Sequence, residues 1–99
     1  MNMQALMKQA QAMQKKMLES KQKIDEKIFE GNSELVNIKM NGKREVLSVE
    51  LKNMDDFEKD DVEVLQDMIT IAINDVLKKI EREYNDVLGS QTNLPGGFF

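Results

Sequence analysis

Two groups of basic side chains are the part of this sequence best suited to chemistry, because ammonium and guanidinium groups bind phosphate oxygens. The N-terminal basic group is Lys8, Lys15 and Lys16, and the C-terminal basic group is Lys78, Lys79 and Arg82. The first group is accompanied by three glutamines, Gln4, Gln11 and Gln14. Amide side chains can contact phosphates or base edges. Composition alone favours a plainer interpretation, in which both groups are ordinary solvated faces of helices.

Most catalytic chemistry is excluded by what the sequence lacks. Its 99 residues contain no Cys and no His, which removes thiolates, the usual nucleophilic triads and the commonest general base. An acidic cluster at residues 55–61 lacks the Gly and the ligand spacing of a calcium loop, so a solvated turn is the better interpretation. We therefore expect a protein that binds or scaffolds, with no enzyme activity, cofactor, metal or small-molecule substrate.

Charge is distributed unevenly along the chain. The net charge is −4, yet residues 1–24 carry five lysines against Glu19 alone. An acidic average argues against nucleic-acid binding over the whole surface but leaves room for a local basic surface. No apolar run approaches the ~20 residues of a membrane span, and the N-terminal stretch lacks the apolar region of a secretory signal. We expect a single cytoplasmic domain with no membrane contact.

Both basic groups fall on predicted helices. Over residues 60–88 apolar residues recur at steps of three or four, the spacing of one helix face. We expect this helix to begin with Asp60 as N-cap, in a capping box with Glu63, and to stop at Gly89. A buried strand at residues 69–73 is the alternative.

A second long helix is predicted over residues 2–28. Good helix formers fill this stretch, and its narrow apolar stripe consists of Met3, Leu6, Ala10, Met13, Met17 and Ile24. A stripe of this kind is typical of a seam between packed helices. The alternative is an adaptable, methionine-rich binding groove.

A small antiparallel sheet is predicted between the helices. Residues 28–30 could form a short strand, and Asn41-Gly42 separates two strand-like runs at 35–40 and 43–51. Asn-Gly predicts a hairpin with a type I′ turn, in which both central residues have positive φ. Apolar residues alternate onto one face of each run: Val36, Ile38 and Met40, then Leu47, Val49 and Leu51. The sequence therefore predicts an α+β fold in which two long helices cover one face of the sheet.

The predicted helix over residues 61–88 is too long to be covered by the rest of a single chain. It is about 42 Å long at roughly 1.5 Å per residue, whereas a compact domain of about 100 residues has a radius of gyration of about 13 Å. We expect a second copy of the chain to cover part of it. The predicted dimer interface lies on this helix and consists of Leu65, Met68, Ile69, Ala72, Ile73 and Val76.

Several short strings occur in an order that is specific to one family. They are Leu6 to Gln11 with Met13 to Met17, Leu35-Val36 through Asn41-Gly42, Val49 to Leu51, Asn74-Asp75 with Lys78 to Glu81, and Leu94 to Phe98. Together they resemble the YbaB/EbfC family of nucleoid-associated DNA-binding proteins. The resemblance covers essentially the whole chain. One departure is that family members often carry a pair of Arg where this chain has Leu47 and Ser48.

The resemblance implies an α-β-β-β-α subunit in an intertwined homodimer whose long helices project as arms. It also implies binding to double-stranded DNA in the nucleoid, with a role in nucleoid organisation or gene regulation. We expect residues 1–89 to form the domain, residues 90–99 to form a flexible tail, and the six side chains of the two basic groups to contact DNA. The missing Arg pair predicts weaker binding.

The alternative function is a dimeric protein–protein adaptor. In that interpretation the methionine-rich stripe and the terminal Phe98-Phe99 anchor another protein. An adaptor predicts no salt-dependent affinity for DNA, so the two hypotheses differ in a measurable property.

Overall fold

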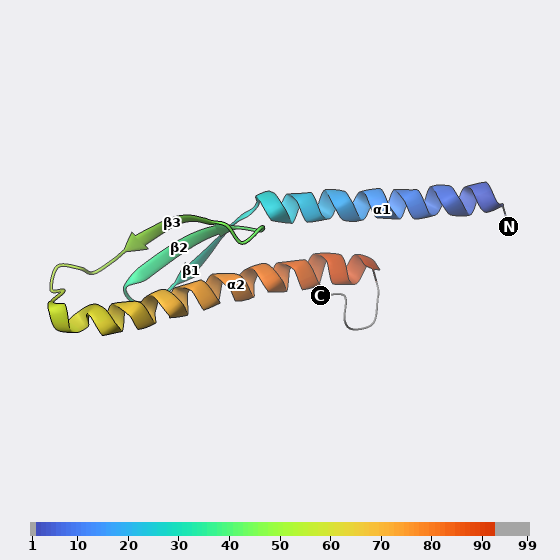
Figure 1. Ribbon diagram of the computed structural model, residues 1–99. Coiled ribbons are helices and arrows are strands. Elements are labelled where there is room, and N and C mark those ends of the chain that lie inside the picture. Colours follow the sequence, from blue (N-terminus) through green and yellow to red (C-terminus); the bar gives the residue numbers. More distant parts are fainter. Residues whose placement is uncertain (1, 93–99) are drawn as a thin grey trace.

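Two long helices and a three-stranded sheet make up the computed structural model, which describes residues 2–92 (Figure 1). The elements in chain order are α1 (Met3–Glu26), β1 (Ile28–Asn32), β2 (Val36–Asn41), β3 (Val46–Leu51), the short 3-10 helix η1 (Lys59–Asp61) and α2 (Val62–Thr92). This order confirms the predicted α-β-β-β-α subunit. The subunit is elongated, with extents of 71 × 23 × 13 Å.

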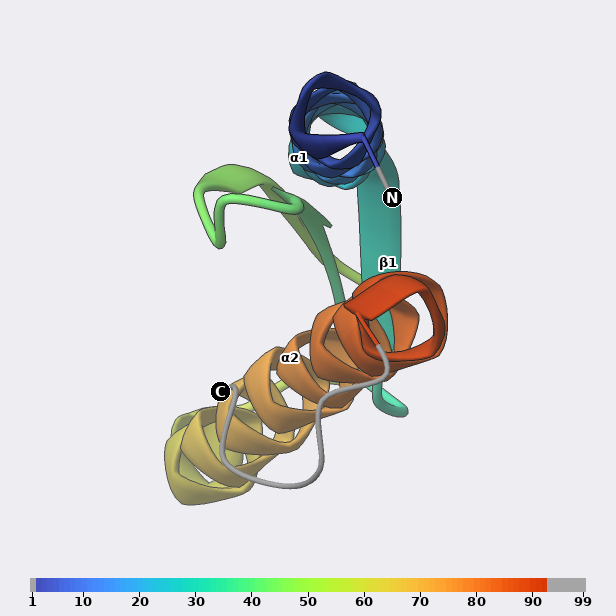
Figure 2. The same cartoon turned by 90° about the vertical axis from the view of Figure 1, so that its right-hand side faces the viewer.

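The sheet is antiparallel, in the strand order β1-β2-β3. Among the described elements, α2 packs on β1 and β2 but not on β3 (Figure 2). The approach is closest at Gly31, where an added Cβ would lie 2.1 Å from the carbonyl oxygen of Ala72. Only glycine lets the helix backbone come this near to β1.

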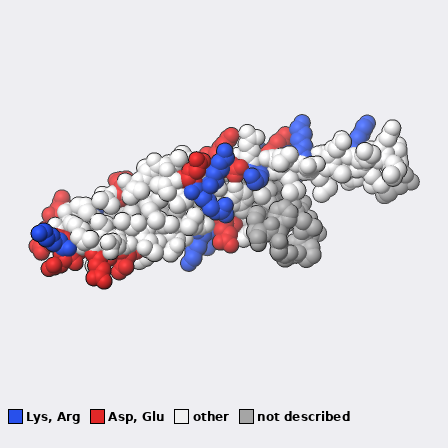
Figure 3. Space-filling view, viewed as in Figure 1, with Lys and Arg blue, Asp and Glu red and all other residues white. Residues whose placement is uncertain are grey.

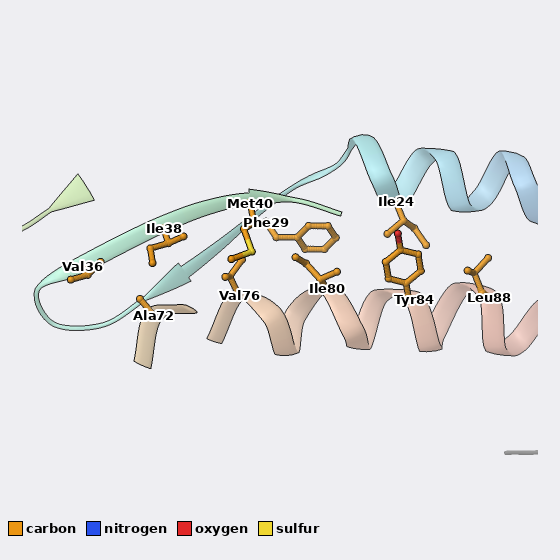
Figure 4. Packing of buried hydrophobic residues seen from close by; sticks show 10 residues of the cluster. All are labelled: Ile24, Phe29, Val36, Ile38, Met40, Ala72, Val76, Ile80, Tyr84 and Leu88. Atoms are coloured by element: carbon orange, nitrogen blue, oxygen red, sulfur yellow. The ribbon is translucent and has the colours of Figure 1, made fainter. Parts of the chain in front are cut away.

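The core lies between α2 and the inner face of the sheet and continues to the end of α1 (Figure 4). The sheet contributes Phe29, Val36, Ile38 and Met40, α2 contributes Ala72, Val76, Ile80, Tyr84 and Leu88, and α1 contributes Ile24. The predicted inner face of β2 is therefore confirmed. The long periodic stretch is a helix and not the alternative strand.

The exposure of β3 contradicts the prediction that two helices cover one face of the whole sheet. Its four apolar side chains, Val46, Leu47, Val49 and Leu51, are each 49–54% exposed. Val49 pairs with Ile38 and Leu51 with Val36, so both lie on the inner face, beyond the strands that α2 covers. The ladder register shifts between Lys39 and Met40, which leaves Leu47 without a partner across it. The helices fail to cover β3 because α1 packs against α2 rather than across the sheet.

The hairpin exists, but the type I′ prediction is wrong. Positive φ occurs at Arg44, with φ 66°, and Gly42 lies outside the left-handed region. Gly42 is required for a different reason, because a Cβ there would lie 2.0 Å from the carbonyl oxygen of Ile24. Its N–H also donates to the carbonyl oxygen of Asp25 at 3.2 Å. The turn is therefore shaped by its contact with α1.

Both predicted ends of the second helix are also wrong. The capping box is formed by Glu58 and Asp61, two residues before the predicted pair Asp60 and Glu63. α2 continues through Gly89 to Thr92, and Gly89 does not adopt the left-handed conformation of a C′ stop. The domain boundary expected at residue 89 thus falls within a helix, and most of the expected tail lies outside the described residues. Over residues 2–92, no helix is both long and apolar enough to cross a membrane.

Candidate nucleic-acid interface

The N-terminal basic group lies on a projecting arm, which we define as residues 3–16 of α1. Asn2 caps the helix, since its side chain accepts the N–H of Gln4 at 3.0 Å. Every residue of the arm is exposed, and α1 meets α2 only toward its C-terminal end (Figures 1 and 4). Apolar residues of the arm share this exposure, with Met3 at 72% and Met13 at 55%. Within one subunit, the part of the methionine-rich stripe that lies on the arm is therefore not a core seam, whereas Ile24 at its end is buried in the core.

Two lysines of the arm point away from α2. Ile24 marks the side of α1 that faces α2, because it is buried against that helix. Lys15 precedes Ile24 by nine residues and Lys8 by sixteen, which places both about 160–180° around the helix from it. Lys16 precedes Ile24 by eight residues, so it lies about 80° from it, on the flank of the helix. Among the described residues, these three lysines form no salt bridge.

Lys79 of the C-terminal basic group is committed to the fold. Its Nζ atom donates to the carbonyl oxygen of Glu30 on β1 at 2.8 Å and lies 3.3 Å from the carboxylate of Asp75. Asp75 in turn accepts the backbone N–H of Asn32 at 3.0 Å. This hydrogen bond, helped by Lys79, holds the pKa of Asp75 below its usual value against the opposing effect of burial. Lys79 and Asp75 thus tie α2 to the edge of the sheet.

Lys78 and Arg82 lie on the outer side of α2. Each is two residues from Ile80, which is fully buried, so each lies about 160° around the helix from the core. Both are exposed, and neither forms a salt bridge within the described part of the chain.

The structure therefore does not bring the two basic groups together. Lys8 and Lys15 face away from α2, whereas Lys78 and Arg82 face away from α1 and the sheet. A duplex is too thick and stiff to reach both outer sides of one subunit at once. One duplex can contact both groups only if they belong to different subunits.

Three basic residues that the sequence interpretation did not select meet at the base of the arm. Lys21 of α1 and the hairpin-turn residues Lys43 and Arg44 line a pocket of about 450 Å³ together with Asp25, Gly42 and Tyr84. We call it the basic pocket. The adjacent Lys43-Arg44 in a turn was a visible signal, but its proximity to Lys21 depends on how the hairpin packs on α1.

Charge is distributed unevenly over the surface (Figure 3). Acidic side chains gather at the end where α2 begins, and basic side chains lie along α1 and around the hairpin turn. The chain's acidic average therefore coexists with local basic surfaces.

The predicted dimer-interface residues divide into two sets. Ala72 and Val76 are 0% exposed, because the subunit's own sheet covers them, so they have no surface left for a partner. The other four are partly buried against the core and keep some exposed surface: Leu65, Met68, Ile69 and Ile73. The apolar side chains of β3 are more exposed than these and were not in the prediction.

Comparison with known proteins identifies a family, several relatives and a solved structure of the same fold. Residues 1–94 match the model of the YbaB/EbfC DNA-binding family. A nucleoid-associated protein from Oceanobacillus iheyensis is 41% identical over 102 residues, covering 98% of this chain and 97% of that protein. A nucleoid-associated protein from Lactococcus lactis subsp. lactis is 43% identical over 94 residues, with coverages of 93% and 94%. An uncharacterized protein from Helicobacter pylori has the same fold, with a TM-score of 0.74 at 22% identity, over 93% of this chain and 98% of that one.

Proposed function

Because this chain belongs to the YbaB/EbfC DNA-binding family, we propose that it binds double-stranded DNA as a homodimer and serves nucleoid organisation or gene regulation. The family is one of DNA-binding proteins, which confirms the expectation of a binding protein rather than an enzyme. The observation that carries the proposal is the arm, a fully exposed helix with Lys8 and Lys15 on one face. The nucleoid is the proposed location, in line with the names of the relatives.

Dimerisation is supported by the apolar surface that one subunit leaves exposed. Half-exposed Val49 and Leu51 continue the inner face of the sheet past the edge of α2. Because β3 is an edge strand with an apolar face, leaving it in water invites pairing with another chain. A second copy is the occupant we propose, since a two-fold dimer buries the same surface on both subunits.

A dimer also allows one duplex to contact both basic groups, although the two groups face in opposite directions within one subunit. Lys8, Lys15 and Lys16 of one subunit grip phosphates from one side, and Lys78 and Arg82 of the other subunit reach the duplex from another. Lys79 contributes through its position in the fold rather than through a phosphate contact, because its ammonium group already has two protein partners. Lysine ammonium groups that contact the DNA backbone give affinity without sequence preference.

A charge-reversal series tests this proposal. Lys8→Glu with Lys15→Glu should weaken binding to a random duplex at least tenfold at about 0.1 M salt, since two phosphate contacts are replaced by repulsion. Lys59→Glu is the control, because Lys59 is an exposed lysine at the opposite, acidic end. Equal affinity for the arm variant and the control variant would reject the arm as the DNA-contacting element.

The adaptor function remains the second candidate because of one observation, the exposed methionines of the arm. Met3, Met7 and Met13 are 55–72% exposed in the subunit. An adaptor predicts that replacing Met7 and Met13 by Gln abolishes capture of a protein partner and leaves DNA affinity at the wild-type level. Loss of DNA affinity on reversing Lys8 and Lys15 instead favours the DNA-binding function.

A further inference from the structure

The basic pocket lies where three elements meet: the end of α1, the hairpin turn between β2 and β3, and the last third of α2. It is lined by Lys21, Asp25, Gly42, Lys43, Arg44 and Tyr84 and has a volume of about 450 Å³. Three of these side chains are cationic and one is anionic, so the lining carries a net positive charge. Around the hairpin turn, basic side chains lie beside acidic ones on the face shown in Figure 3.

The hairpin turn is ordered by hydrogen bonds that present Lys43 and Arg44 to the pocket. The side-chain oxygen of Asn41 accepts the N–H groups of Lys43 at 2.9 Å and Glu45 at 3.1 Å. The N–H of Arg44 donates to the carbonyl oxygen of Asn41 at 3.0 Å. These bonds hold Arg44 at φ 66°, a conformation that L residues rarely adopt. The guanidinium carbon of Arg44 lies 5.6 Å from the centre of the Tyr84 ring.

The one carboxylate in the pocket is already engaged. Asp25 accepts a hydrogen bond from the hydroxyl group of Tyr84, and its other oxygen lies 3.4 Å from Nζ of Lys21. Glu45, the next acidic group along the turn, accepts from the side-chain amide of Asn41 at 2.9 Å. Lys43 and Arg44 form no salt bridge among the described residues, so their charges are available to an anion.

We propose that the basic pocket binds one backbone phosphate of duplex DNA, with Lys21, Lys43 and Arg44 as its ligands. Arginine donates two parallel hydrogen bonds to phosphate oxygens, and the lysines add positive charge around the same group. This inference rests on the proposed DNA-binding function and extends it from the arm to the junction of the arm with the body. The hairpin turn thereby becomes part of the DNA-binding surface.

The position of the pocket gives this phosphate a particular role. α1 passes into β1 through Lys27 alone, so the base of the arm is fixed to the sheet. Gln14 lies two helical turns before Lys21 on the same face, about 10 Å along the arm. A phosphate in the pocket therefore fixes the position of the DNA backbone relative to the arm, and Gln14 extends the contact outward.

The test uses the full chain and a duplex of random sequence. A length of about 20 base pairs is enough for several phosphate contacts. Lys43→Gln with Arg44→Gln should weaken binding about five- to tenfold at about 0.1 M salt and lower the salt slope by about 0.9, the loss of one phosphate contact. Lys52→Gln with Lys59→Gln removes the same charge away from the arm and should bind within about twofold of wild type. Lys21→Gln is a second variant, because it leaves the unusual backbone of the turn untouched. It should weaken binding in the same direction.

The outcomes separate this inference from the proposed function. If wild type binds the duplex with a salt slope and both pocket variants match the control, the pocket inference is overturned while the arm proposal stands. If wild type does not bind the duplex at all, the proposed function itself fails. Inorganic phosphate, followed through the amide NMR signals of residues 42–44, distinguishes the source of the anion. Signals that move with phosphate but not with the duplex would also overturn the inference.

Discussion

The hydroxyl group of Tyr84 on α2 donates a hydrogen bond to the carboxylate of Asp25 near the end of α1. The same oxygen lies 3.2 Å from the carbonyl oxygen of Gly42, so one side chain touches both the base of the arm and the hairpin turn. Beside it, the buried Ile24 packs against α2 (Figure 4). Tyr84 therefore helps to set the direction in which the arm leaves the body.

Titration of Tyr84 provides the first prediction. Burial, followed by the Asp25 carboxylate, raises the pKa of Tyr84 to about 12. Since this pKa is raised above the unfolded value, the stabilisation is fully present below about pH 10 and is lost as the pH rises through about 12. Tyr84 is the only tyrosine and there is no Trp, so tyrosinate absorbance reports this group alone. Asp25→Asn should lower the midpoint. A wild-type midpoint at the ordinary value would contradict this description of the junction.

A matched pair on α2 separates structural from DNA-contacting lysines. Lys79→Met removes the bond to Glu30 and should lower the free energy of unfolding by about 1 kcal/mol while DNA affinity stays near wild type. Lys78→Met removes an exposed charge from the outer side of the helix. It should weaken DNA binding and leave the free energy of unfolding near the wild-type value. Denaturant unfolding and duplex binding measure the two effects. The assignment is wrong if Lys79→Met weakens DNA binding as much as Lys78→Met does.

Two glycines should respond to alanine in opposite directions. At Gly31 a new Cβ would lie 2.1 Å from the backbone of α2, so Gly31→Ala should cost at least about 2 kcal/mol of stability. At Gly89 the added Cβ meets nothing within 4 Å, and Gly89→Ala should stabilise the helix by about 1 kcal/mol. Thermal unfolding of the two variants checks both signs. A neutral Gly31→Ala would show that α2 packs less closely on β1 than described.

The proposed dimer can be tested on the two faces of β3. Val49→Glu places a charge on the half-exposed inner face and should convert a dimer into folded monomers of 11.4 kDa. Ser48→Glu adds the same charge on the outer face, where Ser48 pairs with Lys39, and should leave the dimer intact. Light scattering at micromolar concentration reads the mass directly. A wild-type chain that is monomeric and folded there would exclude the two-subunit grip.

Most of the fold could be predicted from the sequence because its signals are local. The three- and four-residue steps from Val62 to Val87 and the alternation of Val36, Ile38 and Met40 depend only on the periodicity of a helix and a strand. What failed depends on contacts between distant segments. The exposure of β3 follows from where α2 crosses the sheet, and the role of Gly42 follows from the approach of Ile24.

The candidate site was predictable only in part for the same reason. Charge identified the six basic residues, but nothing local showed that Lys79 would reach Glu30, far away in the chain. The opposite directions of Lys15 and Lys78 depend on how α1 and α2 pack. Arg44 in a left-handed conformation is unexpected, because that region favours Gly, Asn and Asp.

The salt dependence of binding to a random duplex shows whether this protein holds DNA through the phosphates. If lysines of both subunits neutralise DNA phosphates, the logarithm of the association constant should fall with the logarithm of salt concentration with a slope of roughly −3 to −5. That slope should become shallower by about 0.9 for each phosphate contact that a substitution removes. A slope near zero, or no binding at low salt by a chain that is folded and dimeric, would show that these lysines do not hold DNA.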